Sequence, residues 1–424
     1  MLKPVIKTLL TIMIGCHMFA CGNLSLFAQA PFSCVPQLAT VQLKANGDSF
    51  APALIRQERD EKLEISFDEL SHDVHRYSYR LLHCNADWVP SDLPESAFLD
   101  GFNPNPVEEY EPSASTSVPY THYRVTIPNE RVRLKLSGNY LFQLFDEDEA
   151  SDTPLLSVGF RVAEALITVE ANVCSDTDID RNRRHQQLSF TLHHRGYEIR
   201  NPQQELKVEV MQNGRTDNAV RGVLPSFIGQ DVVKYEHLRP LIFPASNEYR
   251  RFETVTTCYL PLGVEAFSYH APYYHAVLRP DVFRNGHYLY DDDHNGYLYI
   301  RNAESDRPDT EADYYLVHFT LQMPEPLPDG ELYLQGGFTH GCLDERFRLQ
   351  YHPQERAYTS IQLLKQGAYD YHYLYLPHGK QSAQTALVEG DFYNTENEYL
   401  LLVYHRKPGE RYDRLIAHRR IFFP

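Results

Sequence analysis

Alternation of apolar and polar side chains along most of the chain is the feature that most limits its fold. Segments 134–136, 188–192 and 206–210 show this two-residue period. It is the pattern of a strand with one buried face, because successive side chains of a strand point to opposite sides. Helical periodicity is scarce, and the best candidate, residues 382–388, would make only about two turns. We therefore expect an all-β fold.

Turn residues separate the alternating segments. Asn295-Gly296 lies between residues 288–290 and 297–300, and both residues tolerate positive φ, so we expect a hairpin there. The chain has 424 residues, among them 30 Tyr, 22 Phe and 27 Pro, a composition that suits short strands and turns. Short strands with frequent turns favour β-sandwiches, and the length suggests two or three domains at about 150 residues each.

The first 30 residues have the composition of an export signal. Lys3 and Lys7 precede an apolar stretch at 9–20, and Ala28-Gln29-Ala30 offers small residues for cleavage. We favour cleavage and soluble export. The alternative is a lipid anchor, because Met18-Phe19-Ala20-Cys21 resembles a lipoprotein box with Cys21 as the acylated residue. No later segment approaches the roughly 18 apolar residues of a membrane-spanning helix.

Three domains follow the signal in our interpretation. A first run of strands closes near residue 164. The proline-rich stretch 323–330 cannot lie within a central strand and is typical of a semi-rigid linker. Residues 88–120 contain six prolines and predict a long ordered loop on the first domain, a common place for binding. The expected boundaries are 1–30, 31–164, 165–323 and 324–424.

The charge balance argues against nucleic acid as a partner. Lys+Arg 40 minus Asp+Glu 57 gives −17, whereas binding to a phosphate backbone needs a basic surface. One stretch differs: a hairpin is expected between 400–404 and 415–423, with its turn at 407–410. From His405 to Arg420 it is locally basic, with Arg406, Lys407, Arg411, Arg414, Arg419 and Arg420. Such a segment either steers docking or is simply solvated, and both interpretations stay open.

Searches for catalytic motifs find nothing that assigns an active site. The chain has no Gly-x-Ser-x-Gly, no His-Glu-x-x-His and no phosphate-cradling glycine loop. Catalytic groups can be scattered along a sequence, so a hydrolase is kept as a distant third possibility. We expect no enzyme, and we assign no catalytic, cofactor-binding or metal-binding residue.

Acidic and histidine-containing segments were considered as metal ligands. Asp176, Asp178 and Asp180 alternate as in calcium loops, but Arg181 and Gln187 stand where an EF-hand needs Gly and Glu. We therefore interpret them as an acidic turn, and the run from Asp291 to Gly296 as a hairpin turn. The pairs His193-His194 and His72-x-x-His75 are expected to be ordinary exposed or hydrogen-bonded histidines. After residue 30 come Cys34, Cys84, Cys174, Cys258 and Cys342, without a Cys-x-x-Cys pair, and we expect most of them to be buried.

Several motifs resemble one exported family. Residues 82–91 read Leu-His-Cys-Asn-Ala-Asp-Trp-Val-Pro-Ser, which resembles the plug protein of the type IX secretion system of Bacteroidota. The likeness covers nearly the whole chain after the signal. Its further matches are at 137–140, 184–187, 212–215, 247–252, 312–315, 389–390 and 395–399. Tyr249 stands where the family often has Phe, which keeps the aromatic ring.

The resemblance implies tandem immunoglobulin-like or E-set β-sandwich domains and no catalysis. It also implies that the protein occludes the periplasmic side of the outer-membrane translocon barrel when no cargo is in transit. The expected partner is that barrel, and the expected location is the periplasm, at the inner side of the outer membrane. A wide β-barrel has an aqueous lumen that leaks unless it is filled.

A second resemblance concerns the last hundred residues. Segments 332–338, 357–363 and 367–373 are similar to immunoglobulin-like glycogen-binding modules. Those modules stack sugar on an exposed Trp, but here Thr339-His340-Gly341 follows the first strand and the only Trp is Trp88. The likeness therefore implies the fold and not sugar binding, and an extracytoplasmic carbohydrate-binding protein is the alternative function.

Overall fold

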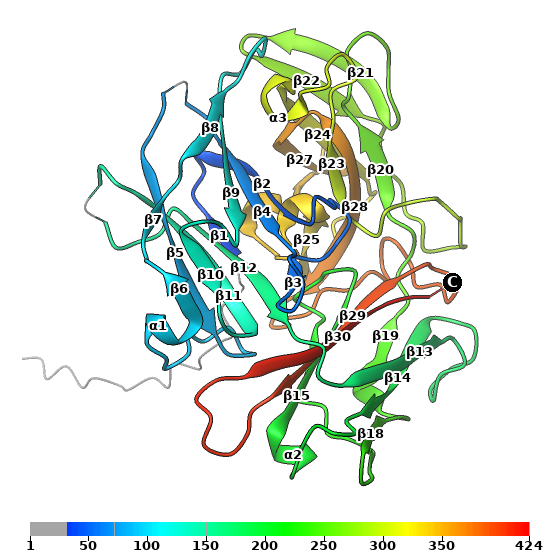
Figure 1. Cartoon of the computed structure of the whole chain (residues 1–424). Coiled ribbons are helices and arrows are strands. Elements are labelled where there is room, and N and C mark those ends of the chain that lie inside the picture. The colour runs from blue at the N-terminus through cyan, green and yellow to red at the C-terminus, as the bar shows by residue number, and fades with distance from the viewer. Residues whose placement is uncertain (1–31, 72, 150, 424) are drawn as a thin grey trace, which may run out of the picture.

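The computed structural model describes residues 32–71, 73–149 and 151–423, so the predicted signal, Cys21 and His72 lie outside it. The described chain is built of strands (Figure 1), which confirms the all-β prediction. Its α-helices, α1 (Glu95–Phe98), α2 (Pro202–Glu205) and α3 (Pro308–Glu311), have four residues each. The described residues contain no helix that could cross a membrane. Short 3₁₀ turns occur at η1 (Arg239–Leu241), η2 (Gly337–Thr339) and η3 (Glu345–Phe347).

Residues 382–388, the best helical candidate, form a turn. The N–H groups of Val388 and Glu389 both donate to the carbonyl of Thr385, and the chain then leaves in an extended course. The segment that was the best helical candidate is therefore a single turn and not a helix of two turns.

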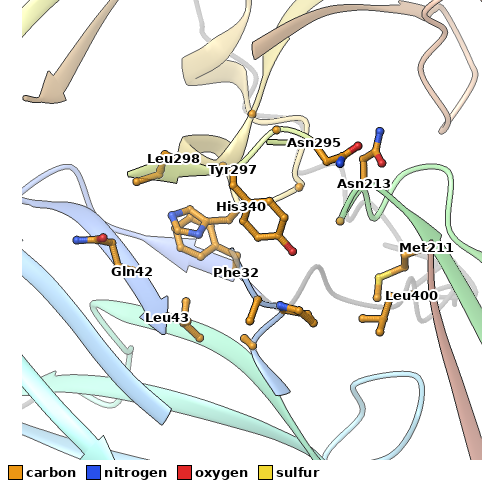
Figure 2. Close-up of a pocket in the computed structure, with 18 of the residues that line it drawn as sticks. Phe32, Gln42, Leu43, Met211, Asn213, Asn295, Tyr297, Leu298, His340 and Leu400 are labelled. Atoms are coloured by element: carbon orange, nitrogen blue, oxygen red, sulfur yellow. The ribbon is translucent and has the colours of Figure 1, made fainter. Parts of the chain in front are cut away.

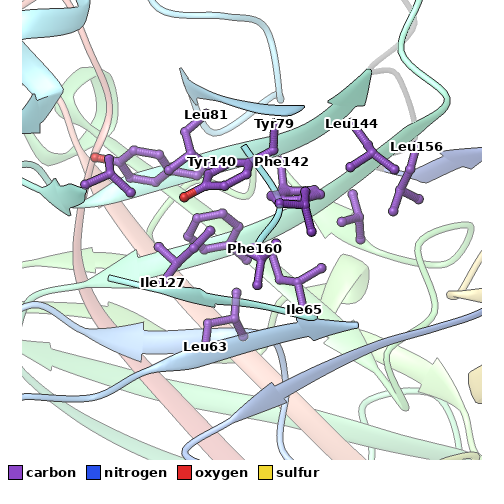
Figure 3. Packing of buried hydrophobic residues seen from close by; sticks show 14 of the residues in the cluster. Leu63, Ile65, Tyr79, Leu81, Ile127, Tyr140, Phe142, Leu144, Leu156 and Phe160 are labelled. Atoms are coloured by element: carbon purple, nitrogen blue, oxygen red, sulfur yellow. The ribbon is translucent and has the colours of Figure 1, made fainter. Parts of the chain in front are cut away.

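The first sandwich is made of residues between 32 and 163. One sheet has the order β1-β12-β11-β5-β7, with β3 parallel to β12, and the other has the order β2-β4-β9-β8; β10 pairs with β6. Leu63 and Ile65 of one sheet pack against Tyr140, Phe142 and Phe160 of the other (Figure 3). The strands are β1 (Phe32–Cys34), β2 (Leu38–Ala45), β3 (Leu54–Arg56), β4 (Leu63–Glu69), β5 (Tyr77–Cys84), β6 (Leu99–Gly101), β7 (Asn105–Pro106), β8 (Glu109–Pro112), β9 (Thr121–Ile127), β10 (Val132–Leu134), β11 (Gly138–Asp146) and β12 (Leu156–Ala163).

The second sandwich is made of two separate pieces of the chain. Sheet β13-β14-β18-β17, with β19 on β14, faces sheet β16-β15-β29-β30, and both contribute to one core that includes Leu188, Val210 and Leu401. Its strands are β13 (Thr168–Cys174), β14 (His185–His193), β15 (Leu206–Gln212), β16 (Val220–Arg221), β17 (Phe227–Ile228), β18 (Val232–Tyr235), β19 (Ile242–Pro244), β29 (Glu398–His405) and β30 (Arg414–Phe422).

The third sandwich lies between those two pieces in the sequence. Sheet β20-β28-β23, with β25 also on β28, shares a core with sheet β21-β22-β24-β27-β26. Its strands are β20 (Arg250–Glu253), β21 (Val264–His270), β22 (Tyr273–Leu278), β23 (Leu298–Ile300), β24 (Tyr314–Gln322), β25 (Gly330–Gln335), β26 (Gln350–His352), β27 (Ala357–Lys365) and β28 (Gly367–Pro377).

The sheets therefore do not divide the chain at 323/324. Strand β24 pairs with β27 along nine residues across that point, and β29 pairs with β15 rather than with a C-terminal domain. The proline-rich stretch 323–330 joins β24 to β25 inside the third sandwich. Proline excludes a stretch from a central strand, but a connection within a domain satisfies that restriction as well as a linker does.

One of the two predicted hairpins is present. Strands β29 and β30 pair antiparallel around the turn at 407–410. The other prediction was wrong: β23 pairs with β28, while residues 288–290 belong to a long irregular loop in which the Tyr288 hydroxyl donates to Glu248. The turn itself has the expected backbone, with φ of 53° at Asn295 and 87° at Gly296.

Candidate functional site

In both acidic turns, several carboxylates contact neighbouring side chains. Asp178 accepts from Gln187 at 2.7 Å and lies 2.9 Å from His237, and Asp180 lies 2.7 Å from the His185 ring. In the second turn, Asp291 pairs with Arg251. These contacts agree with the interpretation of both segments as turns.

The histidines singled out in the sequence are not brought together. His193 lies 3.2 Å from Glu170, and the neighbouring His194 bonds to the Tyr197 carbonyl at 3.1 Å. The N–H of His75 donates to the Tyr123 hydroxyl. Neither segment supplies a shared ligand set among the residues that the structure describes.

The basic C-terminal hairpin forms contacts within the protein. Arg406 pairs with Asp413 at 2.8 Å, Arg414 with Glu164 at 2.9 Å and Arg420 with Glu398 at 2.7 Å. Arg411 and Arg419 are exposed. Three of the six basic residues are thus paired with acids within the protein, and one role of the hairpin is to hold sandwiches together.

Three regions of buried polar contacts follow. The first, which we call the hairpin junction, links the first sandwich to the β29–β30 hairpin. Asp413, fully buried, accepts from the N–H of Ala86 at 3.0 Å and from Lys207 at 2.8 Å. The side-chain oxygen of Asn85 accepts from Arg406 at 2.7 Å. Burial opposes ionisation, but Lys207 and the backbone N–H hold the pKa of Asp413 below its usual value.

Trp88 closes the same junction. Its indole is buried under the Arg161 guanidinium, 5.0 Å from the ring centre, and its φ is 64°. Asn139 donates to the Asn85 and Ala86 carbonyls and accepts from the Tyr404 hydroxyl. The His-Cys-Asn-Ala-Asp-Trp motif is therefore explained by its contacts with the last two strands.

The second region, the Asp68 junction, joins the first sandwich to the third. Asp68 bonds to Lys365 at 2.6 Å, to the Tyr314 hydroxyl at 2.7 Å and to the His122 ring at 2.7 Å. Both charged partners are buried, with 0% of Asp68 and 1% of Lys365 exposed. Although burial alone would raise it, Lys365 and His122 hold the pKa of Asp68 below its usual range. Sequence reasoning missed this pair, since a single Lys at the end of an alternating segment gives no signal of burial.

A third region fixes the segment between β28 and β29. Glu389, fully buried, pairs with Arg250 at 3.1 Å and with Arg284 at 2.8 Å, and Arg250 also contacts Asp281 at 2.6 Å. Burial opposes ionisation of Glu389, but the two guanidinium groups lower its pKa. The family-like motifs at 247–252 and 389–390 meet here.

A cavity of about 240 Å³ lies where the three sandwiches meet (Figure 2). Leu43 comes from the first sandwich, Met211 and Leu400 from the second, and Tyr297 and Leu298 from the third. His340 lies 3.8 Å from Phe32, ring centre to ring centre, in a stacked arrangement. His340 stands where sugar-binding modules display a Trp, and the first sandwich covers it. Trp88 is also buried, so neither residue supports the carbohydrate-binding alternative.

Comparisons with known proteins match this architecture. A crystal structure at 2.30 Å of a hypothetical protein from Parabacteroides merdae is 40% identical, with a TM-score of 0.90, over 92% of this chain and 98% of that one. The family model for the first domain of type 9 secretion system plug proteins matches residues 38–164. The chain belongs to the type IX secretion system plug protein family. No curated protein matches it.

Membership in the plug family associates the protein with this secretion machinery and implies a periplasmic or outer-membrane-associated location. The family match ends at residue 164, directly after β12, the last strand of the first sandwich. The motifs at 82–91 and 137–140 lie at the hairpin junction and the motif at 312–315 lies at the Asp68 junction, so contacts between sandwiches explain these parts of the family-like sequence.

Proposed function

We propose that this protein is a non-enzymatic accessory component that occludes the periplasmic side of the outer-membrane translocon barrel while no cargo is in transit. The observation that carries the proposal is the plug-family match over the first sandwich. The proposed location is the periplasm, at the inner side of the outer membrane.

The build of the molecule supports this role. A buried ion pair between Asp68 and Lys365 links the first sandwich to the third, and the buried Asp413 carboxylate, paired with Lys207, links the second sandwich to the first by accepting from Ala86. Removing one partner from such a pair is costly, so the pairs favour one fixed arrangement. A compact body of 394 residues, 424 less the 30 of the signal, has a radius of gyration of about 21 Å. A body of that size is suited to fill part of a wide, water-filled lumen.

A pull-down from gently solubilised outer membranes tests the partner. With a tagged full-length chain as bait, we expect mass spectrometry to recover a very large outer-membrane barrel. Recovery of glycans or sugar-processing enzymes without the barrel would contradict the proposal.

Leakage of a periplasmic marker enzyme tests the gating role separately. Deletion of the plug gene should increase leakage only in cells that contain the barrel. A double deletion of plug and barrel serves as the control, and leakage that persists in it would show that the pore being sealed is a different one.

A further inference from the structure

Three histidines lie together on the solvent-facing side of the third sandwich. His270 is on β21, His275 on β22 and His318 on β24, three neighbouring strands. In the antiparallel pair, Ser268 is opposite His275 and His270 opposite Tyr273; in the parallel pair, Val277 is opposite His318. Because opposite residues share a face, the three imidazoles are diagonal neighbours on one side of the sheet.

The rings are close enough to share a ligand. Nδ1 of His275 lies 2.8 Å from Nε2 of His318. The His270 ring centre is 5.0 Å from that of His275, with the planes nearly perpendicular at 88°. Two imidazole nitrogens bound to one zinc ion at about 2.0–2.1 Å in a tetrahedral site are roughly 3.3 Å apart, so the inner pair needs to separate by only about 0.5 Å.

Several other histidines of the protein are paired with carboxylates, and the three clustered rings are not among them. His122, His185, His237 and His405 each lie within 3.1 Å of an Asp or Glu oxygen. Within the described ranges, no salt bridge to an acid involves any of the three clustered rings.

One side chain has to move to complete a site. As the side chains lie, no group of three His, Cys, Asp or Glu residues in the described part of the chain is arranged to hold a metal ion. His270 is exposed and at the edge strand, and exposed side chains change rotamer within nanoseconds. A three-nitrogen site therefore requires rotation of His270 toward His275, together with the separation of about 0.5 Å within the inner pair.

We propose that His270, His275 and His318 form a binding site for a late first-row divalent cation such as Zn²⁺, Ni²⁺ or Cu²⁺. Imidazole suits these ions, and three histidines leave a further coordination position for water. A bound ion would tie the β21–β22 hairpin to β24 and so stiffen the edge of the sheet. This site is independent of the gating role.

Calorimetric titration of the full chain with Zn²⁺ at pH 7.5, in a buffer without phosphate, tests the proposal. One ion per chain should bind. Loss of a residue that only hydrogen-bonds to a metal ligand costs about 10–100-fold in metal affinity. The double variant His275→Ala/His318→Ala, which removes two ligands, should therefore bind at least tenfold more weakly. His287→Ala, which removes an exposed histidine elsewhere in the third sandwich, is the matched control and should bind as the parent does.

Two further measurements decide the ligand set. The Cu²⁺ paramagnetic resonance spectrum should show nitrogen ligation that is reduced in His270→Ala, and an excess of a chelator such as EDTA should abolish that nitrogen ligation. Thermal unfolding of each variant checks that it remains folded. Absence of saturable binding, equal binding by the double variant and the His287 control, or an unchanged copper spectrum in His270→Ala would each overturn the three-histidine assignment.

Discussion

At the scale of single residues, the protein depends on charges that are out of contact with water. Lys365→Met should destabilise it by roughly 3–5 kcal/mol, because Asp68 would remain buried without its cationic partner. The double variant Asp68→Asn/Lys365→Met should recover part of that loss, since the uncompensated charge is gone. Urea denaturation followed by circular dichroism measures both, and a double variant that is less stable than the single one would contradict the explanation.

Glu248 should make the protein less stable as the pH rises. Burial raises its pKa to about 7, despite the hydrogen bond from Tyr288, while the unfolded value is near 4.5. Between these values the folded state holds more protons than the unfolded one, so this group's contribution to stability falls as pH rises from 4.5 through 7. Glu248→Gln should thus raise the free energy of unfolding by roughly 1–3 kcal/mol at pH 8 and leave it unchanged at pH 4.5.

Denaturant midpoints at the two pH values check the Glu248 prediction. Glu265→Gln, on the exposed face of β21, is the control and should change neither midpoint. An equal effect of Glu248→Gln at both pH values would show that its burial does not control ionisation.

At the scale of elements, turn chemistry was predictable and strand pairing was less so. Asn295-Gly296 has the expected positive φ values, yet the following strand, β23, pairs with β28 rather than with residues 288–290. A turn motif fixes the local backbone, whereas pairing depends on which distant strand buries the next apolar face. The hairpin at 407–410 was predictable because its two strands are also neighbours in the sheet.

The turn at Gly296 offers an element-scale test. A Cβ atom there would lie 2.7 Å from the buried Tyr249 ring, in addition to the strain of φ 87°. Gly296→Ala should therefore cost roughly 2–4 kcal/mol. Gly409→Ala, with φ 90° and nothing within 4 Å of the added atom, carries only the strain of about 1–2 kcal/mol. Equal shifts of the urea midpoint in the two variants would refute the packing argument.

At the scale of the whole molecule, the number of sandwiches was predictable from length and turn spacing, but their membership was not. Nothing in residues 398–422 distinguishes strands that continue the preceding domain from strands that return to an earlier one. The junctions could not be predicted either. The sequence does not show that Asp413 contacts Ala86 or that Lys365 contacts Asp68. The family resemblance supplied what periodicity could not, namely the association with secretion.

Because buried charges connect all three sandwiches, we expect them to unfold together. Differential scanning calorimetry should show one transition whose calorimetric and van't Hoff enthalpies agree. Lys365→Met, which loosens the first sandwich from the third, should broaden it or separate a second transition. Well-resolved multiple transitions in the parent protein would show that the junctions are weaker than their burial indicates.

The two-piece construction of the second sandwich has a consequence for biogenesis. Strand β15 is synthesised before the whole third sandwich, and its neighbour β29 is synthesised only after it. The third sandwich can form while that sheet still has an open edge, and exposed edges invite pairing with other chains. A nascent molecule stalled before residue 398 would therefore carry a complete third sandwich beside an unfinished neighbour, the state in which a periplasmic chaperone would be needed most.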